Sequence, residues 1–203
     1  MTRWFLILAV FFAGLAPAGM SGQIFGPQTA EEADGDGEEE ESEVRLSAED
    51  IPTPITDTEV GDWAEYAMQD GARSRLTVIE RWTEHGDDHL IIQNKLFKKD
   101  RKKNRRKREP TISEETVSVK ERVADARDLG PFDFVTASKI LVDDQRVDAV
   151  VVNYVEDGKV VRQSYFSSQV PVYGLVRGVL IEDNKKTVVI RLLDYGQSGE
   201  DED

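Results

Sequence analysis

The amino-acid sequence predicts an all-β domain: a single curved antiparallel meander sheet, shaped like half of a barrel, with at most one or two short helices. Two observations predict this fold. Between residues 61 and 196, short runs rich in branched and aromatic residues alternate with turn residues. Two of these runs, 147–155 and 187–193, carry apolar residues on both faces, which is typical of strands covered on both sides. The sheet is therefore expected to curve or to pack against another layer.

Short turn sequences divide this region into its expected strands. The predicted strands are 62–68, 73–84, 89–97, 112–122, 139–142, 147–155, 159–167, 175–182 and 187–195. The turns are Gln69-Asp70-Gly71, Gly86-Asp87, Asp143-Asp144, Asp157-Gly158 and Asp183-Asn184. Links this short force consecutive strands to run antiparallel. The segment 123–138 could form one or two helical turns, but Gly130-Pro131 interrupts it.

The first 18 residues have the three parts of a secretory signal peptide. Arg3 supplies a positive charge, residues 4–15 are apolar, and Ala16 and Ala18 fit a cleavage site after Ala18. A membrane-spanning helix needs ~20 apolar residues, so we expect cleavage rather than a transmembrane anchor. The chain has no cysteine, which argues against disulfides and against a lipidated N-terminus. A secreted or periplasmic location is expected.

Acidic residues are concentrated on both sides of the predicted domain, and the chain has a net charge of −14. Between Glu31 and Asp50 there are eleven acidic residues and one basic residue. Residues 19–60 are poor in large apolar side chains, so they are predicted to form a disordered acidic spacer. The sequence then predicts the β domain at 61–196 and an acidic tail at 197–203.

A strongly basic run separates two predicted strands and is expected to form a projecting loop, 98–108. Such a loop could bind a polyanion or a cell-envelope component, or it could be neutralised by the protein's own acidic spacer. No aromatic residue is interleaved with the basic ones for base stacking, which argues against a dedicated nucleic-acid binder. The candidate polyanion-binding residues are Lys98, Lys99, Arg101, Lys102, Lys103, Arg105, Arg106, Lys107 and Arg108.

No catalytic or metal-binding arrangement is apparent in the sequence. The chain lacks cysteine and a Gly-x-Ser-x-Gly element, and its two histidines are His85 and His89. With Gly86, Asp87 and Asp88 they form the sequence His-Gly-Asp-Asp-His, which we interpret as a hairpin tip rather than a metal site. We therefore expect a non-enzymatic protein without a cofactor.

Three short motifs resemble a pattern in small exported bacterial β-domain proteins of unassigned function. They are Gly61-Asp62-Trp63-x-Glu65-Tyr66, the segment 164–177 (SYFSSQVPVYGLVR) and Leu192-Leu193-Asp194-Tyr195-Gly196. Those proteins are similar to half-barrel periplasmic lipoprotein carriers of the LolA and LppX types. The resemblance implies a concave face that can hold acyl chains, and it supplies no catalytic residue. This chain departs from the lipoproteins because it has no lipid-attachment cysteine.

The sequence thus favours an exported protein that binds a lipid or another apolar ligand on a concave sheet. Trp63, Arg177 and Tyr173 are the candidate ligand-binding residues, because a large amphipathic ring or a charged fork near such a face can orient a ligand. The alternative is an envelope or surface interaction protein that binds polyanions through residues 98–108.

Overall fold

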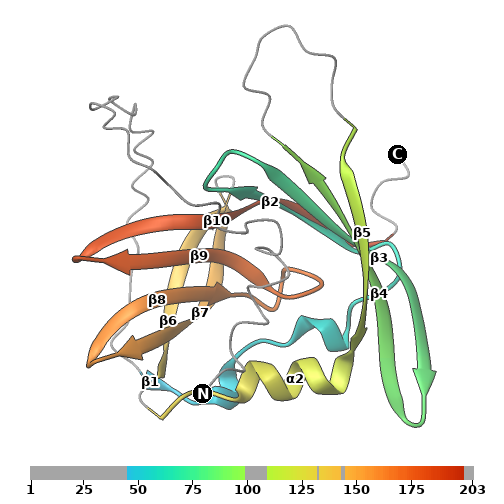
Figure 1. The fold of residues 1–203 in the computed structure, drawn as a ribbon. Helices are drawn as coiled ribbons and strands as arrows, with labels where there is room; N and C mark the ends of the chain where they lie inside the picture. The colour runs from blue at the N-terminus through green and yellow to red at the C-terminus, as the bar shows by residue number, and fades with distance from the viewer. Residues whose placement is uncertain (1–44, 99–108, 132, 143–144, 199–203) are drawn as a thin grey trace, which may run out of the picture. The chain divides into compact units, whose positions relative to one another are not determined.

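The computed structural model describes residues 45–98, 109–131, 133–142 and 145–198 (Figure 1). All of the described residues belong to one compact unit. The predicted signal peptide, residues 19–44 of the predicted spacer, residues 99–108 of the basic run and residues 199–203 of the tail lie outside the described residues.

The described residues form one ten-stranded antiparallel sheet that does not close, which confirms the predicted fold class. Its strand order is β1-β6-β7-β8-β9-β10-β2-β3-β4-β5. The strands are β1 (Arg45–Leu46), β2 (Trp63–Met68), β3 (Arg73–Glu84), β4 (Asp87–Phe97), β5 (Thr111–Ser118), β6 (Phe134–Val142), β7 (Gln145–Glu156), β8 (Lys159–Phe166), β9 (Leu175–Glu182) and β10 (Lys185–Gly196). One α-helix, α2 (Val119–Arg127), and two 3-10 turns, η1 (Ala48–Asp50) and η2 (Pro54–Thr56), complete the described elements.

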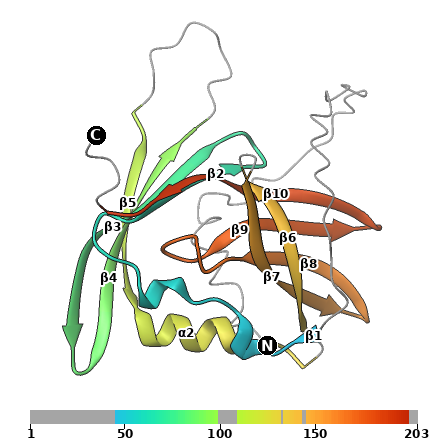
Figure 2. The ribbon, with the colours of Figure 1, turned by 180° about the vertical axis from the view of Figure 1, so that it is seen from behind.

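Two meanders make up the sheet. Strands β2 to β5 form the first and strands β6 to β10 the second, and β10 pairs with β2 to join them. The chain passes from β5 to β6, near the two edges of the sheet, through α2 (Figures 1 and 2). Helix α2 contacts β4, β5 and both 3-10 turns. It is not long or apolar enough to cross a membrane, and this holds for every helix in the described residues.

Helix α2 begins earlier than predicted, because residues 119–122 are helical and not the end of a strand. Ser118 caps the helix, since its Oγ accepts a hydrogen bond from the Glu121 backbone N–H at 3.0 Å. Asp87, on β4, accepts hydrogen bonds from the Ser118 hydroxyl at 2.6 Å and from the Lys120 backbone N–H at 3.1 Å. The predicted strand end at residue 122 was wrong because Asp87, which lies 31 positions before Ser118, supplies part of the hydrogen bonding at the start of the helix.

The folded domain also begins earlier than residue 61. Residues 45–60, assigned from the sequence to the disordered spacer, contain β1, η1 and η2. Ile51 and Ile55 are each only 3% exposed. Ile51 forms a core cluster with Val135 on β6 and Val152 on β7. The spacer prediction was wrong for this segment because two well-placed isoleucines anchor it, although its overall composition is polar.

Three hairpin turns follow the predicted chemistry, whereas the predicted turn Asp143-Asp144 lies outside the described residues. His85 and Gly86, Asp157 and Gly158, and Asp183 and Asn184 all have positive φ angles. Positive φ at both central residues is the mark of a type I′ turn, whose twist matches that of antiparallel strands. The turn at His85-Gly86 lies one residue earlier than the predicted turn at Gly86-Asp87.

Burial distinguishes the two faces of the sheet. We call the face that carries Tyr66, Leu76 and Leu90 the inner face, because these side chains are at most 2% exposed. The opposite, outer face carries the partly or fully exposed residues of β2 to β5. On β7, Val151 and Val152 point to opposite faces and both are 1% exposed. This confirms the predicted strand with apolar residues buried on both sides.

Candidate functional site

The inner face of the first meander is covered by the protein's own loop 167–174, which connects β8 to β9. Val170 and Val172 of this loop are fully buried. The Val172 backbone N–H donates to Thr58 Oγ1 at 3.0 Å, and the Thr58 hydroxyl donates to the Pro54 carbonyl at 2.9 Å. Val172 has a φ of 66°, which a branched residue rarely adopts, so its surroundings must hold it there. This part of the concave face is therefore filled by side chains.

Tyr173, a predicted ligand-binding residue, connects the same loop to β5 and α2. Its hydroxyl donates to Glu115 Oε1 at 3.2 Å, and the guanidinium of Arg122 lies 4.7 Å from its ring centroid. Arg122 Nη2 is 3.8 Å from Glu115 Oε1. Burial raises the pKa of Tyr173 to about 12, although Arg122 acts in the opposite direction. These contacts assign Tyr173 a role in holding the loop across the sheet.

Trp63 and Arg177, the other two predicted ligand-binding residues, lie on the outer face. Trp63 lies opposite Gly196, and the guanidinium carbon of Arg75 is 3.8 Å from the centroid of its ring. The guanidinium carbon of Arg177 is 5.4 Å from the ring centroid of Tyr165. The structure therefore does not bring these two residues together with Tyr173, which extends from the loop on the inner side.

The predicted polyanion-binding residues can be placed only in part. Lys98, at the end of β4, is exposed. The remaining basic residues of the run, Lys99, Arg101, Lys102, Lys103, Arg105, Arg106, Lys107 and Arg108, lie outside the described residues.

The histidine-containing hairpin has structural contacts. His89 stacks on Trp82, with ring centroids 5.3 Å apart. The pKa values of Asp87 and Asp88 are lowered, mainly by hydrogen bonds from the hydroxyls of Ser118 and Thr83 respectively. Within the described ranges, no three potential metal ligands are grouped together.

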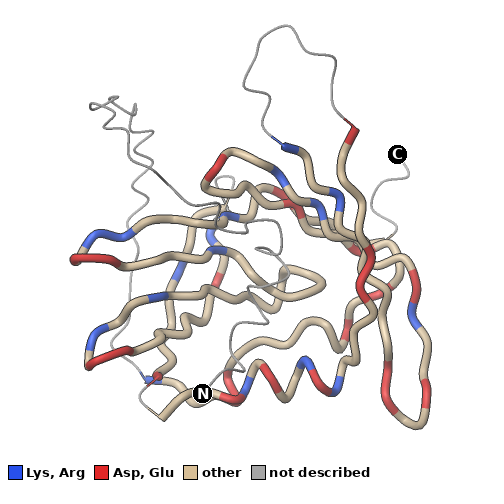
Figure 3. The backbone as a smooth tube through the Cα atoms, viewed as in Figure 1, with Lys and Arg blue, Asp and Glu red and all other residues tan. Residues whose placement is uncertain are grey.

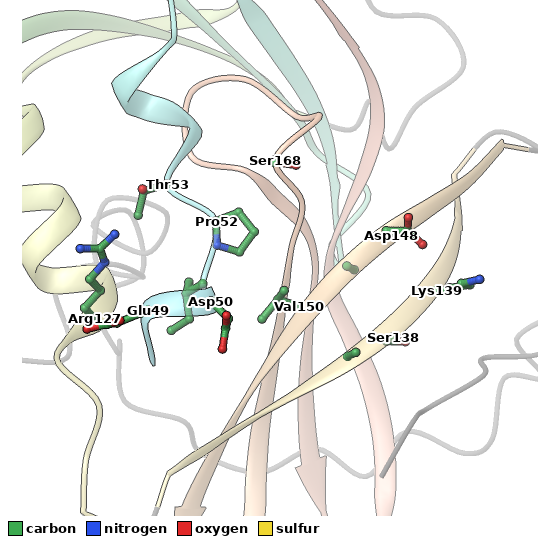
Figure 4. Close-up of a pocket in the computed structure, with 13 residues that line it drawn as sticks. Glu49, Asp50, Pro52, Thr53, Arg127, Ser138, Lys139, Asp148, Val150 and Ser168 are labelled. Carbon is green, nitrogen blue, oxygen red and sulfur yellow. The ribbon is translucent and has the colours of Figure 1, made fainter. Parts of the chain in front are cut away.

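A cavity of about 860 Å³ lies between strands β6 and β7 and the segment that follows β1 (Figure 4). In Figure 4, Val150 points from β7 toward the segment that carries Asp50 and Pro52. The loop residue Ser168 and the helix residue Arg127 also contribute to the lining. The apolar lining residues are Ile51, Pro52, Ala137, Ala149 and Val150, and the polar ones are Glu49, Asp50, Thr53, Arg127, Ser138, Lys139, Asp148 and Ser168.

The polar lining of this cavity includes charges of both signs. The Ser47 backbone N–H and hydroxyl donate to Asp50 Oδ2 at 2.7 and 2.9 Å, and these hydrogen bonds lower the pKa of Asp50. Arg127 and Lys139 are exposed cations. Ser138 is 4% exposed, and its hydroxyl has no hydrogen-bond partner in the part of the chain that the structure describes. Ser138 and Val150 lie on opposite faces of the β6–β7 pair, so this buried hydroxyl does not point into the cavity.

This cavity was not predicted, because five of its thirteen lining residues belong to the predicted spacer. The two isoleucines of Ile51-Pro52-Thr53-Pro54-Ile55 were the available sequence signal that this segment packs against the domain. Comparison with protein-family models, curated proteins and solved structures gives no match. The resemblance to LolA and LppX carriers therefore stays a prediction.

Proposed function

We propose that this protein is an exported, non-enzymatic binding protein that holds a small amphipathic ligand in the cavity between β6, β7 and residues 49–53. The cavity carries this proposal: its volume of about 860 Å³ lies within the range of about 300–1,000 Å³ that is usual for small-molecule sites. Ile51, Pro52 and Val150 offer an apolar wall.

The charges around the cavity favour a zwitterionic or neutral polar group on the ligand. Carboxylates at Glu49, Asp50 and Asp148 are balanced in part by the cations Arg127 and Lys139. A ligand of one strong sign would meet a like charge whichever way it is oriented.

A non-enzymatic role agrees with the structural roles of the titratable groups that have shifted pKa values. Asp50 caps η1, Asp87 supports the start of α2, and Tyr173 fastens the loop 167–174. These three shifts therefore have structural explanations.

Native mass spectrometry of the protein purified from its host tests the proposal, together with titration by a fluorescent lysophosphatidylcholine. We expect co-purified amphiphile and saturable binding of the probe. Ala137→Phe adds an aromatic ring to the cavity wall and should weaken binding, whereas Ala124→Phe adds the same volume on the exposed surface of α2 and should leave binding unchanged. A folded Ala137→Phe variant that binds like the wild type would overturn the proposal.

A further inference from the structure

Strand β5 lies at one end of the strand order and pairs with β4 on one side. It has eight residues, whereas β1, at the other end of the order, has two. Every second residue of an edge strand directs its N–H and C=O groups away from the sheet. In the described ranges, no backbone hydrogen bond outside the sheet ladders involves residues 111–117. Among the described residues, the outward side of β5 is therefore a row of unpaired hydrogen-bonding groups.

This edge lacks several of the features that usually protect a long edge strand. Native proteins protect such strands with lysine, proline, a bulge or a covering segment. Residues 111–118 contain no lysine, proline or glycine, and their register with β4 is continuous. Residues 111–114 are all exposed, and Ile112 keeps 55% of its surface accessible. Another extended chain can therefore continue the ladder without any change in β5.

Contacts with neighbouring elements hold β5 in place. Glu115 Oε1 accepts a hydrogen bond from the Tyr173 hydroxyl at 3.2 Å and lies 3.8 Å from Arg122 Nη2. At the end of the strand, the Ser118 hydroxyl donates to Asp87 Oδ2 at 2.6 Å. A strand that is already ordered loses little conformational entropy when a partner binds to it. These contacts therefore make β5 a preorganised template for a further strand.

The charge of this edge favours a basic partner. From Glu109 to Ser118 the chain has three carboxylates and no basic residue. Figure 3 shows acidic residues and no basic residue along β5. Glu115 is engaged as described above, whereas Glu114 is exposed and accepts a hydrogen bond from Gln93 Nε2 at 3.0 Å. A lysine or arginine directly across from Glu114 would form a favourable cross-strand pair, and an acidic residue would form an unfavourable one.

A second copy of β5 fits this edge poorly. Two antiparallel copies that keep the same face outward are centred on a single residue position, because side chains alternate between the two faces. The two registers with the longest overlap are centred on Glu114 and on Glu115, so each places a glutamate opposite its own copy. Like charges directly opposite each other destabilise a sheet. The edge therefore discriminates against pairing with itself.

We propose that β5 binds an extended segment of a partner protein as an eleventh strand of the sheet, with a lysine or arginine of that segment opposite Glu114. Ile112 and Thr116 lie two positions to either side of Glu114, on the same face. They favour branched apolar side chains two positions before and after the basic residue, whereas Ser113 and Glu115 on the other face favour polar ones. Main-chain hydrogen bonds supply the affinity, and these side-chain pairs supply the selectivity.

A fluorescently labelled peptide, Thr-Val-Thr-Lys-Thr-Val-Thr, tests the proposal on the full chain by fluorescence polarisation. We expect saturable binding, and replacement of the central lysine by glutamate should weaken it about fivefold, because an attractive cross-strand pair becomes a repulsive one. Glu114→Lys should reverse this preference. The matched control, Glu182→Lys, makes the same charge change at the exposed end of β9 and should leave the preference for lysine unchanged.

Two N-methylated forms of the lysine peptide distinguish main-chain pairing from side-chain binding. One form carries the methyl groups on its valines and lysine, and the other carries them on its threonines. Only one of these two sets of N–H groups can face β5, so one form should bind and the other should not. Hydrogen exchange of the complex with the unmethylated peptide should show new protection of amides within residues 111–118.

Four outcomes would overturn the proposal. The first is no saturable binding of the lysine peptide. The second is equal affinity of its two N-methylated forms, which would exclude main-chain pairing. The third is an unchanged preference for lysine in the folded Glu114→Lys variant. The fourth is a dimer in analytical ultracentrifugation whose residues 111–118 are protected from exchange without peptide, which would assign the edge to a second copy of the chain.

Discussion

Replacement of Ile51 by alanine tests whether the segment before residue 61 belongs to the folded domain. Ile51 is 3% exposed and packs against Val135 and Val152. The substitution removes three buried carbon atoms, which contribute about 0.8 kcal/mol each, and it leaves a cavity whose cost adds to that sum. We expect the free energy of unfolding to fall by about 3 kcal/mol.

Urea unfolding followed by far-UV circular dichroism measures this change, and the matched control is Ile112→Ala. Ile112 is 55% exposed on β5, so its replacement should change the free energy of unfolding by no more than about 0.5 kcal/mol. If Ile51→Ala does not fold, Ile51→Val provides a smaller step of about 1 kcal/mol. Equal effects of the Ile51 and Ile112 variants would refute the conclusion that residues 45–60 are an integral layer of the domain.

Three further predictions concern the β3–β4 hairpin, the inner face and the covering loop. Because the folded-state pKa values of Asp87 and Asp88 are lowered, the stabilisation they provide is complete above the unfolded-state pKa of about 4 and is lost as pH falls below it. The urea midpoint should therefore fall between pH 6 and pH 2, and Asp87→Asn should make this fall smaller. Gly178→Ala would bring a Cβ atom to 2.6 Å from Cγ2 of Ile190. Thermal unfolding should show a loss of stability of about 1–3 kcal/mol. An unchanged melting temperature would contradict the close packing of β9 and β10. Tyr173→Phe removes the hydrogen bond to Glu115 and should cost about 1 kcal/mol without altering the fold, and a neutral effect would show that the loop is held by packing alone.

Local alternation and turn chemistry made most of the sheet predictable from the sequence. The strand 73–84 has the predicted bounds because its inner residues, such as Leu76 and Val78, alternate with polar ones. The strand order was not predictable, because the pairing of β10 with β2 joins residues more than 100 positions apart. The predicted ligand-binding residues lie on different sides of the sheet, and this too was not predictable. Trp63 and Tyr173 are both large aromatic residues near turns, and only the tertiary fold separates them onto opposite sides of the sheet.

The cavity and the free edge of β5 lay beyond sequence reasoning for different physical reasons. Three segments that are distant from one another in the sequence line the cavity, and they contain Ile51, Arg127 and Val150. Its wall could not be inferred from a spacer whose composition is polar. The free edge of β5 depends on the strand order, because the pairing of β10 with β2 joins the two meanders and leaves β5 at the end of the sheet. Short turns in the sequence indicate which consecutive strands are neighbours, but they do not indicate which strand ends the sheet.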